Sequence, residues 1–229
     1  MADKAVQEAA PTIAALQRDR TMLTMLSLFL PHLRLHSQLI KLQYNAGSSG
    51  CFPLHYDSDE SVDARRVTAI LYLNPGWEPA HGGELQLFPW PRPPVTIPPL
   101  DNRLVIFSTC RMLHRVLPSL AERFCLTTWM SIMNPGPPPT PIQHLEAGSS
   151  DRSLENLAAQ PEVRRALAKV HLKDSWAQSL IESHADSEAR TSMLATFWRE
   201  VELLQQKIKI LGLDGIEVSK LKHAPVQWF

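Results

Sequence analysis

The chain has 229 residues, 44% of them apolar, and its 23 basic side chains balance its 23 acidic ones. This length supports one full-sized core, or a medium domain with a small appendage. The zero net charge disfavours a strongly basic nucleic-acid or membrane-surface binder, although a local patch stays open. Cys51, Cys110 and Cys125 are odd in number and widely spaced, which favours free thiols in a reducing compartment over a disulfide framework.

Residues 1–36 form the first zone, which we predict to be helical and to buttress the sheet that follows. An apolar stripe recurs at helical spacing, and Pro31 closes the run. The stripe consists of Ile13, Leu16, Leu23, Leu26 and Phe29. The segment does not resemble a signal peptide, and its apolar run is well short of the ~20 residues that span a bilayer. We therefore expect a protein of the cytoplasm or the nucleus.

Residues 37–133 form the second zone, in which Gly, Pro and Asn separate short stretches of strand-like sequence. The predicted strands are 37–45, 51–57, 65–74, 83–89, 94–98, 103–109, 112–119 and 123–132. A set of short antiparallel strands like this predicts a jelly roll (a double-stranded β-helix), because two facing sheets limit the number of exposed edges. A flat open sheet is the alternative. The fold class is therefore mainly β with flanking helices.

A Pro-rich stretch at 134–150 predicts an extended linker, and residues 151–229 predict a C-terminal helical extension. Its last long segment has an apolar stripe, with Asp186 placed to cap its start and Gly212 its end. The stripe consists of Leu194, Phe197, Trp198, Val201, Leu204, Ile208 and Leu211. This stripe must be buried, either on the β-domain, against a second copy of the chain or against another partner. Its periodicity does not distinguish between these alternatives.

His55 and Asp57 lie two residues apart in the predicted strand 51–57. On a strand, such side chains leave the same face, about 7 Å apart along the chain. An imidazole and a carboxylate are two of the three ligands of the facial triad that holds non-haem Fe(II). By itself the His-x-Asp pair is a weak signal, because it recurs by chance. His114, which follows the apolar run 103–109, is the candidate for the third ligand.

Arg123 begins the otherwise apolar strand 123–132. Burying its charge without a partner would be costly, so its position needs a reason. A small dicarboxylate would supply one, because a guanidinium binds a carboxylate through two parallel hydrogen bonds. Four weak signals therefore occur in order along the chain, each on a predicted strand or at its edge.

With these residues in place, about residues 40–131 resemble the Fe(II)- and 2-oxoglutarate-dependent dioxygenases. The resemblance is to the prolyl 4-hydroxylase branch, which includes the hypoxia-inducible-factor prolyl hydroxylases. The segments "RRVTAILYLN", "GGELQLFP" and "NRLVIFSTCRMLHRVLPS" carry it together with the His-x-Asp pair and the later histidine and arginine. It implies that His55, Asp57 and His114 bind Fe(II).

The resemblance also implies how the co-substrate 2-oxoglutarate is held. Arg123 would bind its distal carboxylate, Thr127 would add a hydrogen bond, and Tyr72 would reach the same carboxylate, with core packing as the alternative for Tyr72. Tyr44 would correspond to a pocket tyrosine near the iron, although one extra residue separates it from the His-x-Asp pair. Trp129 fits the family's Thr-x-Trp pattern, and we interpret it as core packing.

The implied reaction hydroxylates a protein substrate, at a prolyl residue, and converts 2-oxoglutarate and O2 to succinate and CO2, with ascorbate as a stimulant. Arg65 matches a position that contacts peptide in relatives. The acidic loop 58–64 is either a solvated turn or a surface that favours a basic target segment. Two other functions stay open: a non-catalytic jelly-roll module with a partner-binding helical tail, and a nucleic-acid oxidative demethylase, which the neutral charge and the arginine spacing disfavour.

Overall fold

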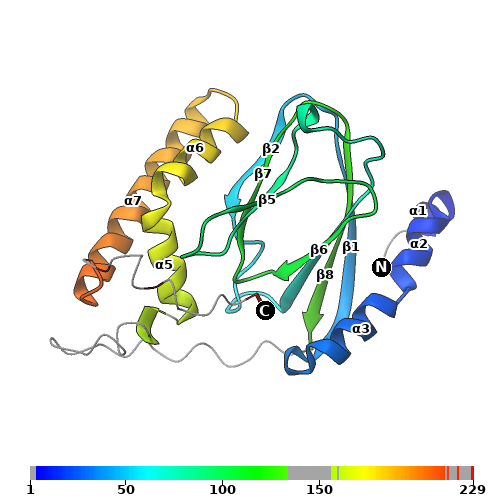
Figure 1. Ribbon diagram of the computed structural model, residues 1–229, viewed down its shortest axis with the longest axis horizontal. Helices are drawn as coiled ribbons and strands as arrows, with labels where there is room; N and C mark the ends of the chain where they lie inside the picture. Colours follow the sequence, from blue (N-terminus) through cyan, green and yellow to red (C-terminus); the bar gives the residue numbers. More distant parts are fainter. Residues whose placement is uncertain (1–3, 134–155, 159, 215, 217–220, 222–227) are drawn as a thin grey trace.

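The computed structural model describes residues 4–133, 156–158, 160–214, 216, 221 and 228–229, so the predicted linker 134–150 lies outside the described residues. Eight strands form two antiparallel four-stranded sheets that face each other (Figure 1). Helices follow the sheets in the chain. This architecture confirms the predicted double-stranded β-helix with a C-terminal helical extension.

The major sheet has the strand order β1-β8-β3-β6, and the minor sheet has the order β2-β7-β4-β5. The major sheet consists of β1 (Leu35–Asn45), β8 (Arg123–Ile132), β3 (Arg65–Tyr72) and β6 (Leu104–Ser108). The minor sheet consists of β2 (Gly50–His55), β7 (Leu113–Ser119), β4 (Leu85–Phe88) and β5 (Val95–Ile97), and the 3-10 turn η2 (Pro79–His81) precedes β4. Each strand overlaps one predicted segment, because turn residues mark the strand ends directly in the sequence.

The N-terminal zone is helical but not continuous. It consists of α1 (Lys4–Ala9), α2 (Pro11–Arg18), α3 (Thr21–Phe29) and the 3-10 turn η1 (Pro31–Leu33). Pro11 lacks the N–H that would continue α1, and the Asp19 carboxylate accepts the N–H of Thr21 at 2.8 Å, which starts a new helix. Arg34 has a left-handed backbone (φ 49°), so the chain enters β1 at Leu35, two residues before the predicted start of the strand at residue 37.

The helix α3 packs on the outer face of the major sheet. Its Leu23 is buried in one cluster with Val67 of β3 and Met130 of β8. Figure 1 shows α1, α2 and α3 beside β1 and β8, on the far side of the sheets from the C-terminal helices. The apolar run before Pro31 is thus part of the support of the major sheet.

The C-terminal helices are α5 (Pro161–His171), α6 (Lys173–Ser183) and α7 (Glu188–Ile210). They lie beside the minor sheet (Figure 1), where α6 covers β2. Trp176 and Leu180 of α6 are buried with Leu54 of β2 and with Phe197 and Val201 of α7. The apolar stripe of α7 therefore packs within its own chain, which answers the question that its periodicity left open.

The ends of α7 differ in how well the sequence predicts them. Ser187 caps the start, because its hydroxyl accepts the N–H of Arg190 at 3.2 Å. The prediction of Asp186 as the cap was wrong, since that carboxylate forms an ion pair with the Arg190 side chain one turn away. Gly212 follows the helix with φ +69°, a conformation that suits glycine. In the part of the chain that the structure describes, no helix has the length and apolarity needed to cross a bilayer.

Replacement of Phe197 by alanine should destabilise the whole chain, because Phe197 is 5% exposed in the cluster that joins α6 and α7 to β2. We expect a loss of about 3–5 kcal/mol in the free energy of unfolding, measured by denaturant titration. The matched control is Leu203→Ala on the same helix, which is 53% exposed and should cost less than about 0.5 kcal/mol. Equal small losses, or a loss that varies with protein concentration, would show that the stripe is buried elsewhere.

Candidate metal centre and co-substrate pocket

Three potential metal ligands come together where the two sheets meet. His55 ends β2, Asp57 lies in the bend that follows, and His114 pairs with His55 across β2 and β7. The Nε2 atoms of His55 and His114 lie 3.5 and 3.7 Å from Oδ1 of Asp57. One ligand atom from each residue falls within 4.8 Å of the others, a spacing that suits a single metal ion. The predicted strand 51–57 was too long, since β2 stops at His55 and Asp57 turns inward from the bend.

Both histidines are held with Nε2 toward the cluster. Nδ1 of His55 lies 2.7 Å from the carbonyl oxygen of Pro53, and Nδ1 of His114 lies 3.0 Å from that of Met112. A carbonyl oxygen can only accept, so each Nδ1 carries the proton and donates it. The Nε2 lone pairs are therefore left free for a metal, as in other sites where a backbone carbonyl fixes the histidine tautomer.

The Asp57 carboxylate is fixed from the major sheet. Its Oδ2 accepts hydrogen bonds from Thr68 Oγ1 at 2.7 Å and from Trp129 Nε1 at 3.2 Å. Burial alone would raise the pKa of Asp57, but hydrogen bonds, among them those from Thr68 and Trp129, outweigh it and hold the pKa well below its usual range. The interpretation of Trp129 as core packing was incomplete, because its indole orients the carboxylate.

The protonation states suit metal binding at neutral pH. Burial, with a smaller contribution from His55, lowers the pKa of His114 to about 4, so its imidazole is neutral. Asp57 is ionised. Neutral imidazole and ionised carboxylate are the forms that ligate metals. Two histidines and one carboxylate that leave open coordination positions are the donor set of non-haem Fe(II) oxygenases, so the residues present fit that ion.

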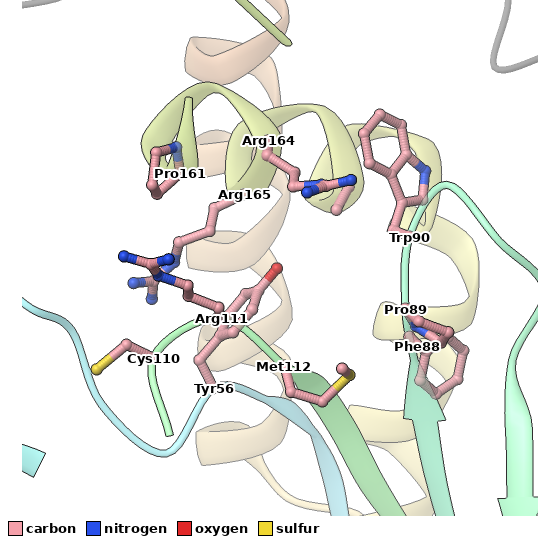
Figure 2. Close-up of a pocket in the computed structure, with 11 residues that line it drawn as sticks. Tyr56, Phe88, Pro89, Trp90, Cys110, Arg111, Met112, Pro161, Arg164 and Arg165 are labelled. Carbon is pink, nitrogen blue, oxygen red and sulfur yellow. The ribbon is translucent and has the colours of Figure 1, made fainter. Parts of the chain in front are cut away.

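Tyr56, between the two ligands, faces away from them into the junction with α5. Its ring is stacked by the Arg165 guanidinium, with the guanidinium carbon 4.3 Å from the ring centroid. Figure 2 shows Tyr56 below α5, with Arg164 and Arg165 reaching down from the helix and Arg111 beside the ring. Burial raises the pKa of Tyr56 to about 12. The His-x-Asp segment thus contacts the sheets on one side and the C-terminal helices on the other.

A pocket of about 140 Å³ extends from the three ligands between the sheets to Arg123. Arg123 is buried, and its Nε donates to the carbonyl oxygen of Gly83 at 2.8 Å. A Cβ on Gly83 would lie 2.8 Å from Arg123 Cδ and from Ser119 Oγ, so glycine makes room for the arginine. No Asp or Glu in the described part of the chain forms an ion pair with Arg123. The pocket therefore offers a buried cation to a carboxylate ligand.

Hydroxyl groups surround that cation. The Tyr72 ring lies 5.1 Å from the Arg123 guanidinium carbon, and its buried hydroxyl has no hydrogen-bond partner among the described residues. Burial raises the pKa of Tyr72 to about 12, so the hydroxyl keeps its proton and can donate. Thr127 lines the pocket between Arg123 and the metal ligands. The Arg123 guanidinium in the pocket and the Tyr72 hydroxyl beside it are suited to the distal carboxylate of 2-oxoglutarate.

The structure contradicts the role expected of Tyr44. This side chain lies on the face of β1 away from the pocket, where it is 56% exposed, stacks on Phe124 at 4.8 Å and donates to Glu122 at 2.6 Å. Gln43 faces the pocket instead and contacts Thr127. Neighbouring residues of a strand point to opposite faces, so Tyr44 points outward where Gln43 points into the pocket.

Arg65 and the acidic side chains of loop 58–64 form ion pairs and hydrogen bonds within the chain. Arg65 pairs with Asp63 at 2.6 Å, donates to the Asp57 carbonyl at 3.3 Å and lies over the Trp129 ring at 5.2 Å. The other two acids of the loop are also paired, Asp59 with Arg165 at 2.6 Å and Glu60 with Arg111 at 2.8 Å. These pairs neutralise the loop, which removes the basis for a preference for basic targets.

Known proteins share this arrangement. Residues 40–131 match the 2OG-Fe(II) oxygenase superfamily. A crystal structure of a prolyl 4-hydroxylase from Phytophthora capsici is 32% identical and has a TM-score of 0.79, over 97% of this chain and 75% of that one. This chain belongs to the 2OG-Fe(II) oxygenase superfamily. A match of that extent includes the C-terminal helices of this oxygenase as well as its sheets.

Curated relatives match a shorter part of the oxygenase. Over 86 residues it is 37% identical to the prolyl hydroxylase EGLN3 of Mus musculus, a match that covers 36% of each protein. Over 70 residues it is 41% identical to the hypoxia-inducible factor prolyl hydroxylase of Caenorhabditis elegans, covering 29% of this chain and 10% of that protein. The matched part thus amounts to about a third or less of the length of these relatives.

Replacement of Thr68 by valine should weaken metal binding, because it removes the hydrogen bond that orients Asp57. We expect a loss of about 10- to 100-fold in affinity for Fe(II) or Mn(II), measured by anaerobic titration without co-substrate. Thr128→Val is the matched control, since Thr128 is buried on the opposite face of the neighbouring strand and should leave the affinity unchanged. An unaltered affinity in Thr68→Val would refute the orienting role of this hydroxyl.

Proposed function

We propose that this oxygenase hydroxylates a protein substrate at a prolyl residue. The observation that carries the proposal is one pocket with a His-Asp-His cluster at one end and a buried arginine at the other. That arginine has no acidic partner in the described part of the chain. The choice of a prolyl residue is supported by relatives named prolyl hydroxylases in mouse, nematode and Phytophthora capsici.

His55, Asp57 and His114 would hold Fe(II), and Arg123 would pair with the distal carboxylate of 2-oxoglutarate. When bound, iron and 2-oxoglutarate supply the oxidative chemistry that yields hydroxylated product, succinate and CO2. The protein's own part is to keep Asp57 ionised and oriented, to present neutral Nε2 atoms, and to enclose the co-substrate between the sheets. We also expect ascorbate to stimulate turnover.

Two further roles belong to the same proposal. The Tyr72 hydroxyl is buried beside the guanidinium and has no hydrogen-bond partner in the described part of the chain, so it would donate to the same carboxylate as Arg123. Arg65, at the start of β3 beside Trp129, would contact the substrate peptide while it holds Asp63. Its guanidinium has donors beyond those used within the chain, because arginine carries five.

In this proposal each segment of the chain has a separate role. Residues 37–133 carry the site, residues 1–36 buttress the major sheet, and 134–150 link the sheets to the helices. Residues 151–229 hold β2, the strand that ends in a metal ligand. Ser179 of α6 supports this role, because its hydroxyl accepts the N–H of Leu54, next to His55, at 2.9 Å.

Turnover of 2-oxoglutarate to succinate by the purified protein should depend on Fe(II). His114→Ala should abolish it, and Arg123→Lys should raise the KM for 2-oxoglutarate by about tenfold or more, because lysine cannot form the two parallel hydrogen bonds. His36→Ala, on an exposed residue of β1, is the control and should behave as the parent protein.

The target residue is found by mass spectrometry of protein fragments incubated with the enzyme. A gain of one oxygen atom on proline, lost in His114→Ala, is the expected result. Oxygen gained on another residue type would overturn the prolyl assignment and leave the oxygenase. No turnover in the reconstituted parent, with or without peptides, would favour the non-catalytic binding module.

A further inference from the structure

Gln43 occupies a position in the co-substrate pocket to which the sequence drew no attention. It lies on the inner face of β1, the edge strand of the major sheet, opposite Cys125 of β8. Its Oε1 accepts the Thr127 hydroxyl at 2.6 Å and lies 3.5 Å from Cys125 Sγ. Two donors converge on this oxygen, which fixes the orientation of the side-chain amide.

The contact between Gln43 and Thr127 uses the single hydrogen of the Thr127 hydroxyl. While that hydrogen points to Gln43, Thr127 presents only lone pairs to the pocket, and lone pairs repel a carboxylate. Thr127 is 3% exposed, so bulk water does not replace the missing partner. In this arrangement Thr127 cannot donate to a bound co-substrate.

We propose that Gln43 is a positioning residue for 2-oxoglutarate, and that its side-chain amide turns over when the co-substrate binds. After the turn, the amide NH2 donates to Thr127 Oγ1, and the Thr127 hydroxyl donates to the co-substrate carboxylate. Only hydrogen bonds change: the Thr127 hydroxyl keeps an acceptor, and the weak 3.5 Å contact from Cys125 Sγ to Gln43 Oε1 is lost. The terminal torsion of glutamine is broad and nearly two-fold, so the turn needs no change of backbone. This inference rests on the proposed function, since it concerns the same pocket.

Gln43→Glu tests the turn, because a carboxylate has nearly the shape of the amide but cannot donate. It keeps accepting the Thr127 hydrogen and therefore holds Thr127 in the orientation that opposes the co-substrate. We expect the affinity for 2-oxoglutarate to fall by at least about tenfold, the worth of one hydrogen bond to a charged group. The readout is calorimetric titration of the Mn(II)-loaded protein with 2-oxoglutarate, which needs no turnover. In steady-state assays the KM for 2-oxoglutarate should rise more than kcat falls.

Three further variants separate this hydrogen-bond relay, from Gln43 through Thr127 to the co-substrate, from simple charge repulsion. Gln86→Glu adds the same charge on β4 outside the pocket, where Gln86 contacts Thr96, and should leave the affinity unchanged. In a Thr127→Val background, Gln43→Glu should lose much less affinity than it does in the parent, because the relay has no hydroxyl to act through. Gln43→Met, which removes donor and acceptor together, should fall between the parent and Gln43→Glu. Melting temperatures check that each variant is folded.

The outcomes distinguish this inference from the proposed function. If the Mn(II)-loaded parent does not bind 2-oxoglutarate, the proposed function fails, and the role of Gln43 fails with it. If the parent binds and Gln43→Glu binds equally well, only the role of Gln43 is overturned. The relay is also overturned if Gln43→Glu loses the same affinity with and without Thr127, or if Gln86→Glu matches its effect. Loss confined to Gln43→Glu, and dependent on Thr127, supports the relay.

Discussion

The site depends on one buried carboxylate that joins the two sheets. Asp57 receives hydrogen bonds from Thr68 and Trp129 of the major sheet and faces His55 and His114 of the minor sheet. Burying an ionised carboxylate is costly unless hydrogen bonds compensate it, and here the donors Thr68 and Trp129 come from two neighbouring strands of the major sheet. The spacing of the sheets and the geometry of the metal ligands are therefore fixed by the same contacts.

The C-terminal helices contribute to this geometry because they close an edge of the minor sheet. β2 is an edge strand, and an edge strand leaves backbone N–H groups unpaired. Ser179 pairs one of them, the N–H of Leu54, while Arg165 stacks on Tyr56. The residues on either side of the ligand His55 are thus both held by the helices. The solved structure from Phytophthora capsici matches 97% of this chain, so the match includes these helices.

Local sequence patterns predicted most of the fold, and contacts between distant segments set the remainder. Turn residues and strand alternation mark all eight strands, and the order of the ligand residue types indicates the site. The face presented by Gln43 and Tyr44 depends on a one-residue shift that alternation alone does not locate. The pairing of Asp59 with Arg165 joins residues 106 positions apart, which no local pattern contains. The sequence alone does not distinguish Asp186 from Ser187 as the cap of α7, because both residue types suit that position.

Polar groups that the fold leaves incompletely matched converge on the co-substrate pocket. Arg123 is a buried cation without an acidic partner among the residues that the structure describes, and the buried Tyr72 hydroxyl has no hydrogen-bond partner among them. Both conditions destabilise the folded chain, since buried polar groups normally find partners. A dicarboxylate between the sheets would satisfy both groups, and a metal would satisfy the His-Asp-His cluster. Ligands that bind only the folded state stabilise it. The proposed ligands would therefore act on the same few buried groups that the fold brings together between the sheets, so folding and recognition are linked at this pocket.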